Sequence, residues 1–295
     1  MVRWMGYAAN NVADKKGYWK EQDLDVKVNV YPTSKELHAA FSSGEVDIMH
    51  NVLASGIEHH FNGIDVVVVM QTGYSNGGDK VIVKRGKDVR DLKGQEVAVY
   101  DDDPAVLYFL SKVLDKKETT LNDFKFKVLN PAAASDKFIA GNVNMLMNYD
   151  PEALRAISKG NGEIIASTKD FRSVIPEGWV MKRAKYKEMP KEDFKKLCSG
   201  WVKASEWMKK KKNFKELFQI VKTSTFSGVK ITFRDAKTML AGVKLLSQRE
   251  MRSENKREVF DYFKELREFL KKNNLLKKSF NPNYIVNTTM LIESI

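Results

Sequence analysis

The sequence predicts an α/β protein with two doubly wound mixed sheets, each in its own lobe. Segments typical of short strands alternate with amphipathic helices over the first 166 residues, an order that indicates strands joined by helical crossovers. The alternation forms two successive runs, and 295 residues are enough for two hydrophobic cores. From Lys191 onward the pattern is almost wholly helical. We therefore expect two lobes, with extra helices from the carboxyl-terminal part of the chain.

The predicted strands are short segments of apolar or alternating residues. In chain order they are residues 2–5, 26–30, 46–49, 66–70, 80–83, 96–100, 125–129, 144–147 and 163–166. The longest apolar run, 66–70, suits a buried strand, because a helix that crosses a membrane needs about 20 apolar residues.

Helices with one apolar face are predicted between these strands, at 36–42, 104–114, 134–140 and 152–159. Beyond Lys191, large apolar residues recur at helical spacing, and further helices are predicted at 234–246 and 254–273. This helical run is too long for one surface helix, so we expect a set of helices packed on the first lobe.

The charge of the chain does not predict a nucleic-acid partner. Lysine and arginine total 50 against 38 acidic residues, a net charge of +12. Basic residues alternate with acids at helical spacing, as at Lys191-Glu192-Asp193, which is typical of a solvated helix face. No helix-turn-helix, RNA-binding or zinc signature occurs. Cys198 is the only cysteine, so neither an internal disulfide nor a cysteine-based metal site is expected.

Several ordered motifs resemble one family. Residues 2–52, from VRWMGYAAN to GEVDIMHNV, resemble the start of solute-binding proteins of nitrate/sulfonate/taurine ABC transporters, a family that includes thiamine-precursor binders (NMT1/THI5-like). Ser75, Gly77 and Asp79 match a Ser-x-Gly-x-Asp element, and DLKGQEVAV at 91–99 matches the entry into the second lobe. Residues 142–151 and 175–197 resemble the end of the second sheet and the return crossing.

The resemblance implies a bilobed periplasmic-binding-protein fold of type II, with a ligand cleft between lobes. Lobe one would be residues 1–84 plus 185–295, and lobe two residues 85–184. It also implies an extracytoplasmic, monomeric protein that captures a small organic ligand by hinge closure and delivers it to an ABC transporter permease, without cofactor or catalysis. The implied location is periplasmic or membrane-anchored and extracytoplasmic, and because strand-like sequence starts at Val2 with no signal peptide before it, we expect that the signal of an exported protein has been removed.

The predicted ligand contacts are aromatic, amide and acidic side chains in loops at the carboxyl ends of strands, where α/β proteins bind small ligands. They are Trp4, Tyr7, Asn10, Asn11, Asn51, Val52, Ser75, Asn76, Asp101, Asp102, Asn148, Tyr149 and Trp179.

Two segments depart from the family pattern. Relatives carry small hydroxyl or glycine residues where this chain has Asp101, Asp102 and Asp103, and commonly an aromatic residue where it has Asn148. Asp103 is expected to cap a helix that starts with Pro104. The acidic loop makes a neutral or cationic ligand more plausible than a sulfonate or nitrate. Alternatively, Asp101 and Asp102 face solvent or bind a surface cation.

An enzyme on the same fold, acting on a pyrimidine or menaquinone precursor, is the alternative function. The pyrimidine synthases use a cysteine-rich motif and a reactive histidine, and this chain has Cys198 alone. His59 and His60 are adjacent, and neighbouring helical residues point about 100° apart, so they do not chelate one ion well. We expect neither a metal site nor catalysis, although His50 ends a strand near the expected cleft.

Overall fold

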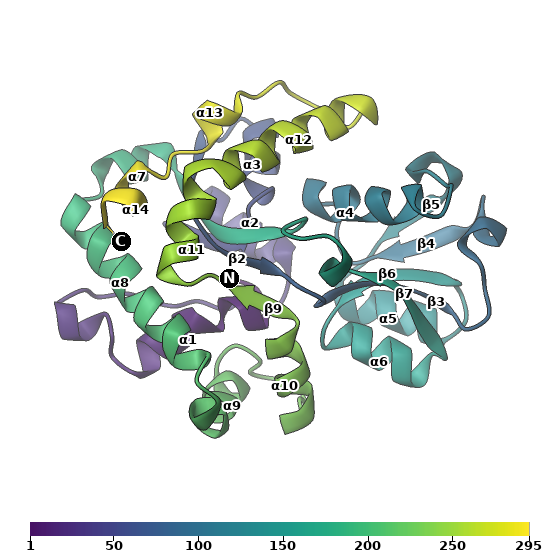
Figure 1. Cartoon of the computed structure of the whole chain (residues 1–295), viewed down its shortest axis with the longest axis horizontal. Helices are drawn as coiled ribbons and strands as arrows, with labels where there is room; N and C mark the ends of the chain where they lie inside the picture. Colours follow the sequence, from purple (N-terminus) through teal and green to yellow (C-terminus); the bar gives the residue numbers. More distant parts are fainter. Residues whose placement is uncertain (295) are drawn as a thin grey trace. The chain divides into compact units, whose positions relative to one another are not determined.

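The computed structural model describes residues 1–294 and contains two compact units. The first unit consists of residues 1–74, 176–236 and the residues from 245 onward. The second consists of 75–175 and 237–244. Relative to the predicted lobes, the segments 75–84 and 237–244 lie in the second unit, and the segment 176–184 lies in the first. Each unit has its own sheet (Figure 1).

The four-stranded sheet, which consists mainly of residues of the first unit, has the strand order β1-β8-β2-β9. These strands are β1 (Ile48–Val52), β8 (Pro176–Lys182), β2 (Val66–Ser75) and β9 (Val243–Leu245). Both β1 and β2 pair antiparallel with β8, so β1 and β2 run parallel to each other on either side of it. β1 therefore forms one edge of this four-stranded sheet.

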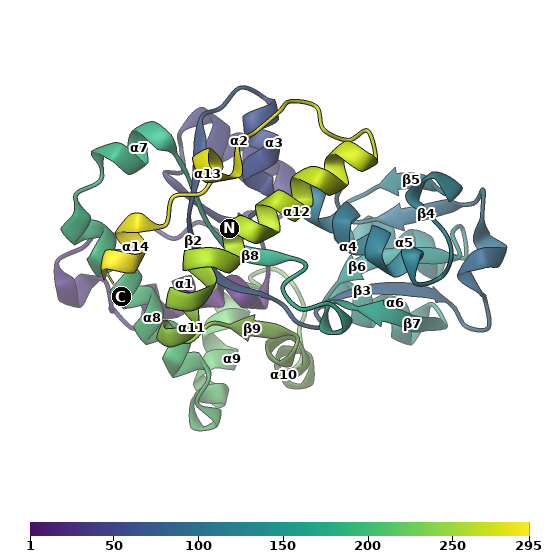
Figure 2. The same cartoon turned by 45° about the horizontal axis from the view of Figure 1, so that its top comes forward.

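Helices surround this sheet. They are α1 (Ala8–Lys15), α2 (Ser34–Ser43), α3 (Ser55–Phe61), α7 (Arg183–Glu188), α8 (Lys191–Met208), α9 (Phe214–Thr223), α10 (Phe233–Ala241), α11 (Gln248–Ser253), α12 (Val259–Lys272), α13 (Pro282–Ile285) and α14 (Thr289–Ser294). α8 contacts both α1 and α14, and Figure 2 shows the carboxyl-terminal α14 beside it. The fully buried Phe194 and Trp201 of α8 extend the core that the sequence pattern predicted for this helix.

The second unit has a five-stranded mixed sheet in the order β5-β4-β6-β3-β7. β4 pairs parallel with β5 and β6, whereas β3 pairs antiparallel with β6 and β7. Its elements are β3 (Asp79–Lys84), β4 (Glu96–Val99), α4 (Pro104–Asp115), β5 (Lys125–Val128), α5 (Pro131–Ile139), β6 (Met145–Tyr149), α6 (Glu152–Lys159) and β7 (Gly162–Ser167). Phe138 of α5 packs with Ile82, Ala98 and Leu146 of three strands in one buried cluster.

The prediction of strands at 2–5 and 26–30 is wrong, because neither segment forms a ladder of paired residues. A single parallel bridge joins Val2 to Tyr31, and Met5–Tyr7 already forms a 3-10 turn that leads into α1. A strand requires successive paired residues, and here the pairing stops after one bridge.

The helix predicted at 234–246 is also too long, because α10 ends at Ala241. The carbonyl of Gly242 accepts hydrogen bonds from the backbone N–H groups of Asn76 and Gly78, and the chain then enters β9. These bonds require a close backbone approach, which glycine permits at this position.

Candidate functional site

Four polar side chains of the first unit meet at the carboxyl end of β1. The hydroxyl of Tyr7 donates to Oδ1 of Asn51 at 3.4 Å, and Nδ2 of Asn51 donates to the hydroxyl of Ser55 at 3.0 Å. The same Nδ2 lies 3.3 Å from Nε2 of His38. Tyr7, Asn51 and Ser55 are buried, and His38 is partly exposed. We call Tyr7, His38, Asn51 and Ser55 the Asn51 cluster.

The local chain path explains why these residues meet. β1 ends at Val52, the backbone N–H of Leu53 donates to the carbonyl of Pro176, and α3 starts at Ser55. The Asn51 and Ser55 side chains therefore belong to consecutive elements joined by a tight turn. Tyr7 reaches them because the chain turns sharply between Trp4 and α1.

Trp4 is fixed by a buried acid. Its indole Nε1 donates to Oε1 of Glu177 at 2.6 Å, and both side chains are buried. A side chain at Gly6 would collide with the Trp4 ring and the Glu177 carboxylate, so the turn between them depends on glycine. Glu177 was not among the predicted site residues, because its strand β8 had no expected sheet position.

A chain of hydrogen bonds joins Asn10 to β2 through His50. Nδ2 of Asn10 lies 2.7 Å from Nδ1 of His50, and Nε2 of His50 lies 2.9 Å from the hydroxyl of Thr72. The Thr72 hydroxyl donates its one proton to the carbonyl of Glu177, so it accepts from His50. His50 is therefore protonated at Nε2 and accepts from the Asn10 amide at Nδ1. Burial also holds the pKa of His50 well below its usual value, which keeps the imidazole neutral.

His38 and its neighbours were missed by the sequence analysis. Nδ1 of His38 lies 3.5 Å from Oε2 of Glu58, and the rings of His38 and His59 are 4.9 Å apart. Burial lowers the pKa of both histidines to about 4. His38 is therefore a neutral ring at neutral pH. No local pattern pointed to it, because only the packing of α2 beside β1 brings it to Asn51.

The other predicted residues of the first unit lie elsewhere. Oδ1 of Asn11 accepts from the hydroxyl of Thr225 at 2.7 Å in the interior. The buried ring of Trp179 packs edge-on against His50 and Trp201. Val52 is half-buried next to Asn51. Asn11 and Trp179 thus hold α1 and β8 in place, and only Val52 directly adjoins the Asn51 cluster.

In the second unit, Ser75 lies in a hydroxyl-rich turn. Its Oγ is 2.8 Å from Oγ1 of Thr168 and accepts from the backbone N–H of Asp79 at 3.1 Å. Thr168 also accepts from the backbone N–H of Gly77 at 2.8 Å. Asn76, which lies between Ser75 and Gly77 in the sequence, is half-buried. The Ser-x-Gly-x-Asp element is therefore a closed turn whose partner, Thr168, was not foreseen.

Tyr149 and Asp79 are joined through Tyr100. The Tyr100 hydroxyl donates to Oδ1 of Asp79 at 2.7 Å, and the rings of Tyr100 and Tyr149 stand nearly perpendicular with centroids 4.8 Å apart. Burial raises the pKa of Asp79 and raises that of Tyr100 well above its usual value. The phenol therefore remains the donor at neutral pH.

A buried ion pair lies beside this group. Nζ of Lys80 lies 2.7 Å from Oδ2 of Asp150 and also donates to the carbonyl of Gly78 at 3.1 Å. The side chains are 8% and 1% exposed. The sequence analysis missed both residues, since a lysine within a strand and an aspartate before proline are common on surfaces.

The acidic loop supplies its own helix cap. Oδ1 of Asp103 accepts from the backbone N–H of Ala105 at 2.8 Å, which confirms the predicted cap of α4. Oδ1 of Asp101 accepts from the backbone N–H of Asp103 at 3.1 Å, and Asp102 is exposed. Carboxylates of the chain itself therefore occupy the positive end of α4.

Asn148 is fully buried and its amide is used within the second unit. Nδ2 donates to the carbonyl of Pro131 at 2.7 Å and to the hydroxyl of Ser135 at 2.9 Å. Its Oδ1 accepts from the backbone N–H of Tyr149 at 2.9 Å. These bonds tie β6 to the start of α5.

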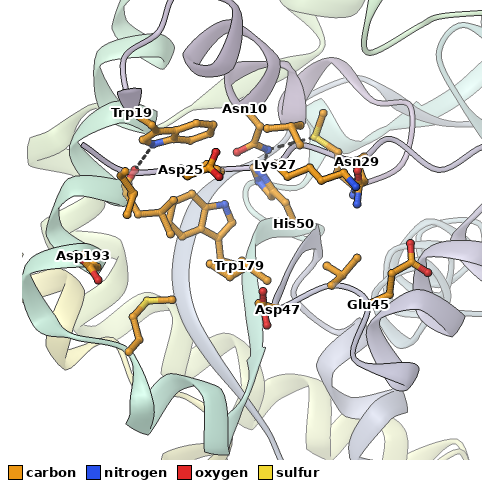
Figure 3. Close-up of a pocket in the computed structure, with 18 residues that line it drawn as sticks. Asn10, Trp19, Asp25, Lys27, Asn29, Glu45, Asp47, His50, Trp179 and Asp193 are labelled. Atoms are coloured by element: carbon orange, nitrogen blue, oxygen red, sulfur yellow. Dashed lines mark hydrogen bonds between the residues drawn. The ribbon is translucent and has the colours of Figure 1, made fainter. Parts of the chain in front are cut away.

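The first unit also contains a cavity of about 470 Å³ (Figure 3). Asn10, His50 and Trp179 line it, whereas Tyr7 and Asn51 do not. It is therefore distinct from the Asn51 cluster, although His50 in its lining packs against the ring of Tyr7 with centroids 4.4 Å apart. The remaining labelled residues are Trp19, Asp25, Lys27, Asn29, Glu45, Asp47 and Asp193.

Three further observations bear on the possible function. Within residues 1–294, no three histidine, cysteine or acidic side chains are grouped so that they could hold a metal ion. In the same range, no helix has the length and apolar character needed to cross a membrane. Burial raises the pKa of the Cys198 thiol far above its usual value, so this thiol is not a reactive thiolate.

Comparison with known proteins reveals relatives by sequence profile and by fold. Residues 1–222 match the profile of the NMT1-like family. No curated protein sequence matches the chain.

Solved structures with the same fold confirm the predicted fold class. The periplasmic aliphatic sulphonate binding protein SsuA of Escherichia coli is similar with a TM-score of 0.77 and 16% identity, over 97% of this chain and 90% of that one. The periplasmic nitrate-binding protein NrtA of Synechocystis PCC 6803 gives 0.75 and 16%, over 99% and 86%. A Candida albicans gene product with the generic periplasmic binding protein fold gives 0.72 and 16%, over 98% and 94%.

Proposed function

The chain belongs to the NMT1-like family, as its motifs predicted, and we propose that it is a solute-binding protein that captures a small polar organic ligand. The observation that carries this proposal is the Asn51 cluster, a group of amide, phenol, imidazole and hydroxyl side chains at the carboxyl end of a strand. This end of a sheet is where α/β proteins bind ligands. The same fold serves sulphonate and nitrate binders.

The ligand class follows from the charges near the predicted contacts. In the first unit the carboxylate of Glu177 accepts from Trp4, and in the second unit the carboxyl of Asp79 hydrogen-bonds with Ser75 and residues 101–103 are acidic. The positive charge of Lys80 is neutralised by Asp150. His38 and His50 are neutral. We infer a neutral or cationic ligand with hydrogen-bond donors, such as a pyrimidine or an amine, instead of a sulfonate or nitrate.

Delivery to an ABC transporter permease, hinge closure on the ligand and an extracytoplasmic location complete the proposal. Support comes from solved structures of this fold, several of which are periplasmic or ABC-import binding components. The absence of catalysis belongs to the same proposal, and the buried, protonated Cys198 supports it because nucleophilic cysteines need an accessible thiolate.

A ligand screen tests the proposal. Thermal unfolding is followed with pyrimidines, polyamines and amino acids, and with taurine, alkanesulfonates and nitrate. A bound ligand raises the melting temperature by mass action, and we expect a rise with members of the first group. Calorimetric titration then gives the affinity for the compound that acts.

Matched asparagine variants link binding to the Asn51 cluster. Asn51→Ala is expected to weaken binding by about 10-fold or more, because it removes a buried amide from the cluster. Asn144→Ala is the control, since that amide bonds Gln95 in an exposed position of the second unit. Equal affinities of the two variants would reject the assigned site. Turnover of a compound that does not raise the melting temperature would reject the binding function.

A further inference from the structure

A strongly basic stretch of the first unit surrounds the helix α9 (Phe214–Thr223). Residues 209–234 contain seven lysines and Arg234 but one acidic residue, Glu216. The carboxylate of Glu216 already pairs with Nζ of Lys16 at 2.9 Å. Figures 1 and 2 show α9 at one end of the first unit, beyond α8. This end of the unit therefore carries a large excess of positive charge.

Most lysines of this stretch have no acidic partner. Lys209 pairs with Glu206 of its own helix. Six exposed lysines form no ion pair within residues 1–294, namely Lys210, Lys211, Lys212, Lys215, Lys222 and Lys230. Elsewhere, as at residues 191–193, lysines alternate with acids. An unpaired run of like charge is instead attracted to an anionic surface.

Three phenylalanine rings lie beside these lysines. The ring of Phe233 stands nearly perpendicular to those of Phe214 and Phe218, with centroids 4.8 and 5.3 Å away. Phe214 and Phe218 are half-buried, whereas Phe233 is 48% exposed. The rings together form a contiguous apolar patch, and an apolar patch bordered by charged residues is typical of an interaction surface.

Helical spacing places the rings and lysines in adjacent stripes on α9. Leu217 and Val221 are buried and face the core. At about 100° per residue, Phe218 lies about 60° around the helix from Val221. Lys222 and Lys215 lie about 40° and 60° beyond Phe218 in the same direction. The order around the helix is therefore core, half-buried rings and exposed lysines. Helices that lie in a bilayer interface have this arrangement, with rings at the acyl boundary and lysines among anionic headgroups.

We propose that α9 and Phe233 form a membrane-binding surface, which attaches the first unit peripherally to a bilayer containing anionic lipids. This surface, the α9 patch, consists of Phe214, Phe218, Phe233, Lys211, Lys215 and Lys222. Phe233 enters the boundary between headgroups and acyl chains, and the lysines bind lipid phosphates. Single-stranded nucleic acid needs several open ring faces for stacking, whereas Phe214 and Phe218 are half-buried against Phe233. The proposal does not depend on the identity of the solute ligand.

Vesicle flotation tests the proposal with the full chain. The vesicles contain phosphatidylcholine alone, or phosphatidylcholine and phosphatidylglycerol in a two-to-one mixture. We expect binding to the anionic vesicles alone, and loss of most of it when the salt concentration rises from about 0.05 M to about 0.5 M, because salt screens the lysine charges. Equal binding to both kinds of vesicle, or binding to neither, would overturn the proposal.

Matched triple variants link binding to the α9 patch. The first combines Lys211→Gln, Lys215→Gln and Lys222→Gln. It is expected to bind anionic vesicles about 100-fold more weakly, since each lysine near an anionic surface contributes about five-fold in affinity. The control combines Lys272→Gln, Lys277→Gln and Lys278→Gln, which removes the same charge from exposed positions of the first unit outside the patch. Equal affinities of the two triple variants would overturn the proposal, because the attraction would then be a property of the whole surface.

Variants of Phe233 test the role of the ring. Phe233→Ser is expected to weaken binding by about 10-fold, because half of this side chain is exposed and available for burial in the bilayer. Phe233→Trp should retain binding, since indole rings favour the membrane interface. Thermal melting of each variant shows that it is folded. Equal binding of Phe233→Ser and Phe233→Trp would overturn the insertion of this ring. Tighter, lysine-dependent binding to a single-stranded oligonucleotide than to the vesicles would overturn the proposal and assign the α9 patch to nucleic acid.

Discussion

Nζ of Lys80 and Oδ2 of Asp150 lie 2.7 Å apart, joining the start of β3 to the residue that follows β6 in the interior of the second unit. Removing one partner of a buried pair leaves an uncompensated charge, which costs about 3–5 kcal/mol. We expect Lys80→Met to lower the free energy of unfolding by about that amount in urea titrations. Lys137→Met is the control, since Lys137 pairs with Glu96 at the surface and such pairs contribute about 0–1 kcal/mol. Comparable losses in both variants would contradict this assignment.

Gly178 is expected to be intolerant of any side chain. It lies on β8 between β1 and β2, and a Cβ there would overlap the carbonyl oxygen of Met70, a backbone atom that cannot rotate away. Gly178→Ala should therefore destabilise the first unit by several kcal/mol or prevent folding. Gly56→Ala is the matched control, because its Cβ would meet Val180 at 3.5 Å, an ordinary contact. Soluble expression and thermal melting compare the two, and a Gly178→Ala protein as stable as Gly56→Ala would refute the packing described for β8.

The sequence predicted those elements whose signals are local. The helix at 152–159 was predicted with the bounds it has in α6, and the Asp103 cap with Pro104 was read from adjacent residues. The insertion of β8 between β1 and β2 was not predicted, because it pairs residues more than 100 positions apart. A strand pattern alone does not specify such partners.

The site was predictable to the same extent. Tyr7 and Asn51 could be chosen because each follows a strand signal, and the structure brings them together. His38 and Glu177 were missed because their contribution depends on which element packs beside β1 and α1. Asn148 was chosen because it lies at the end of a strand. That position does not reveal the hydrogen-bond partners of its amide, which lie at the start of α5.

The two neighbouring histidines His38 and His59 predict a loss of stability in mild acid. Their folded pKa of about 4 lies below the usual 6.5, so the unfolded chain binds more protons between these values. Stability is therefore fully present above about pH 6.5 and falls as the pH drops toward 4, by roughly 2–3 kcal/mol per histidine. NMR titration of the imidazole Cε1–H signals checks the cause directly. If His38 and His59 titrate with midpoints near pH 6.5 in the folded protein, their protonation is not the cause of an acid-induced loss of stability.

The hydrogen bonds of His50 predict one tautomer and a sensitivity to Thr72. Because Thr72 donates to the carbonyl of Glu177 and accepts from His50, ¹⁵N NMR should show a neutral ring protonated at Nε2 at pH 7. Thr72→Val leaves two buried polar groups without this partner and should cost about 1–3 kcal/mol of unfolding free energy. Thr223→Val is the control, since its exposed hydroxyl bonds only carbonyls of its own helix. A ring protonated at Nδ1, or equal stability of both variants, would show that Asn10 and Thr72 do not orient His50 as described.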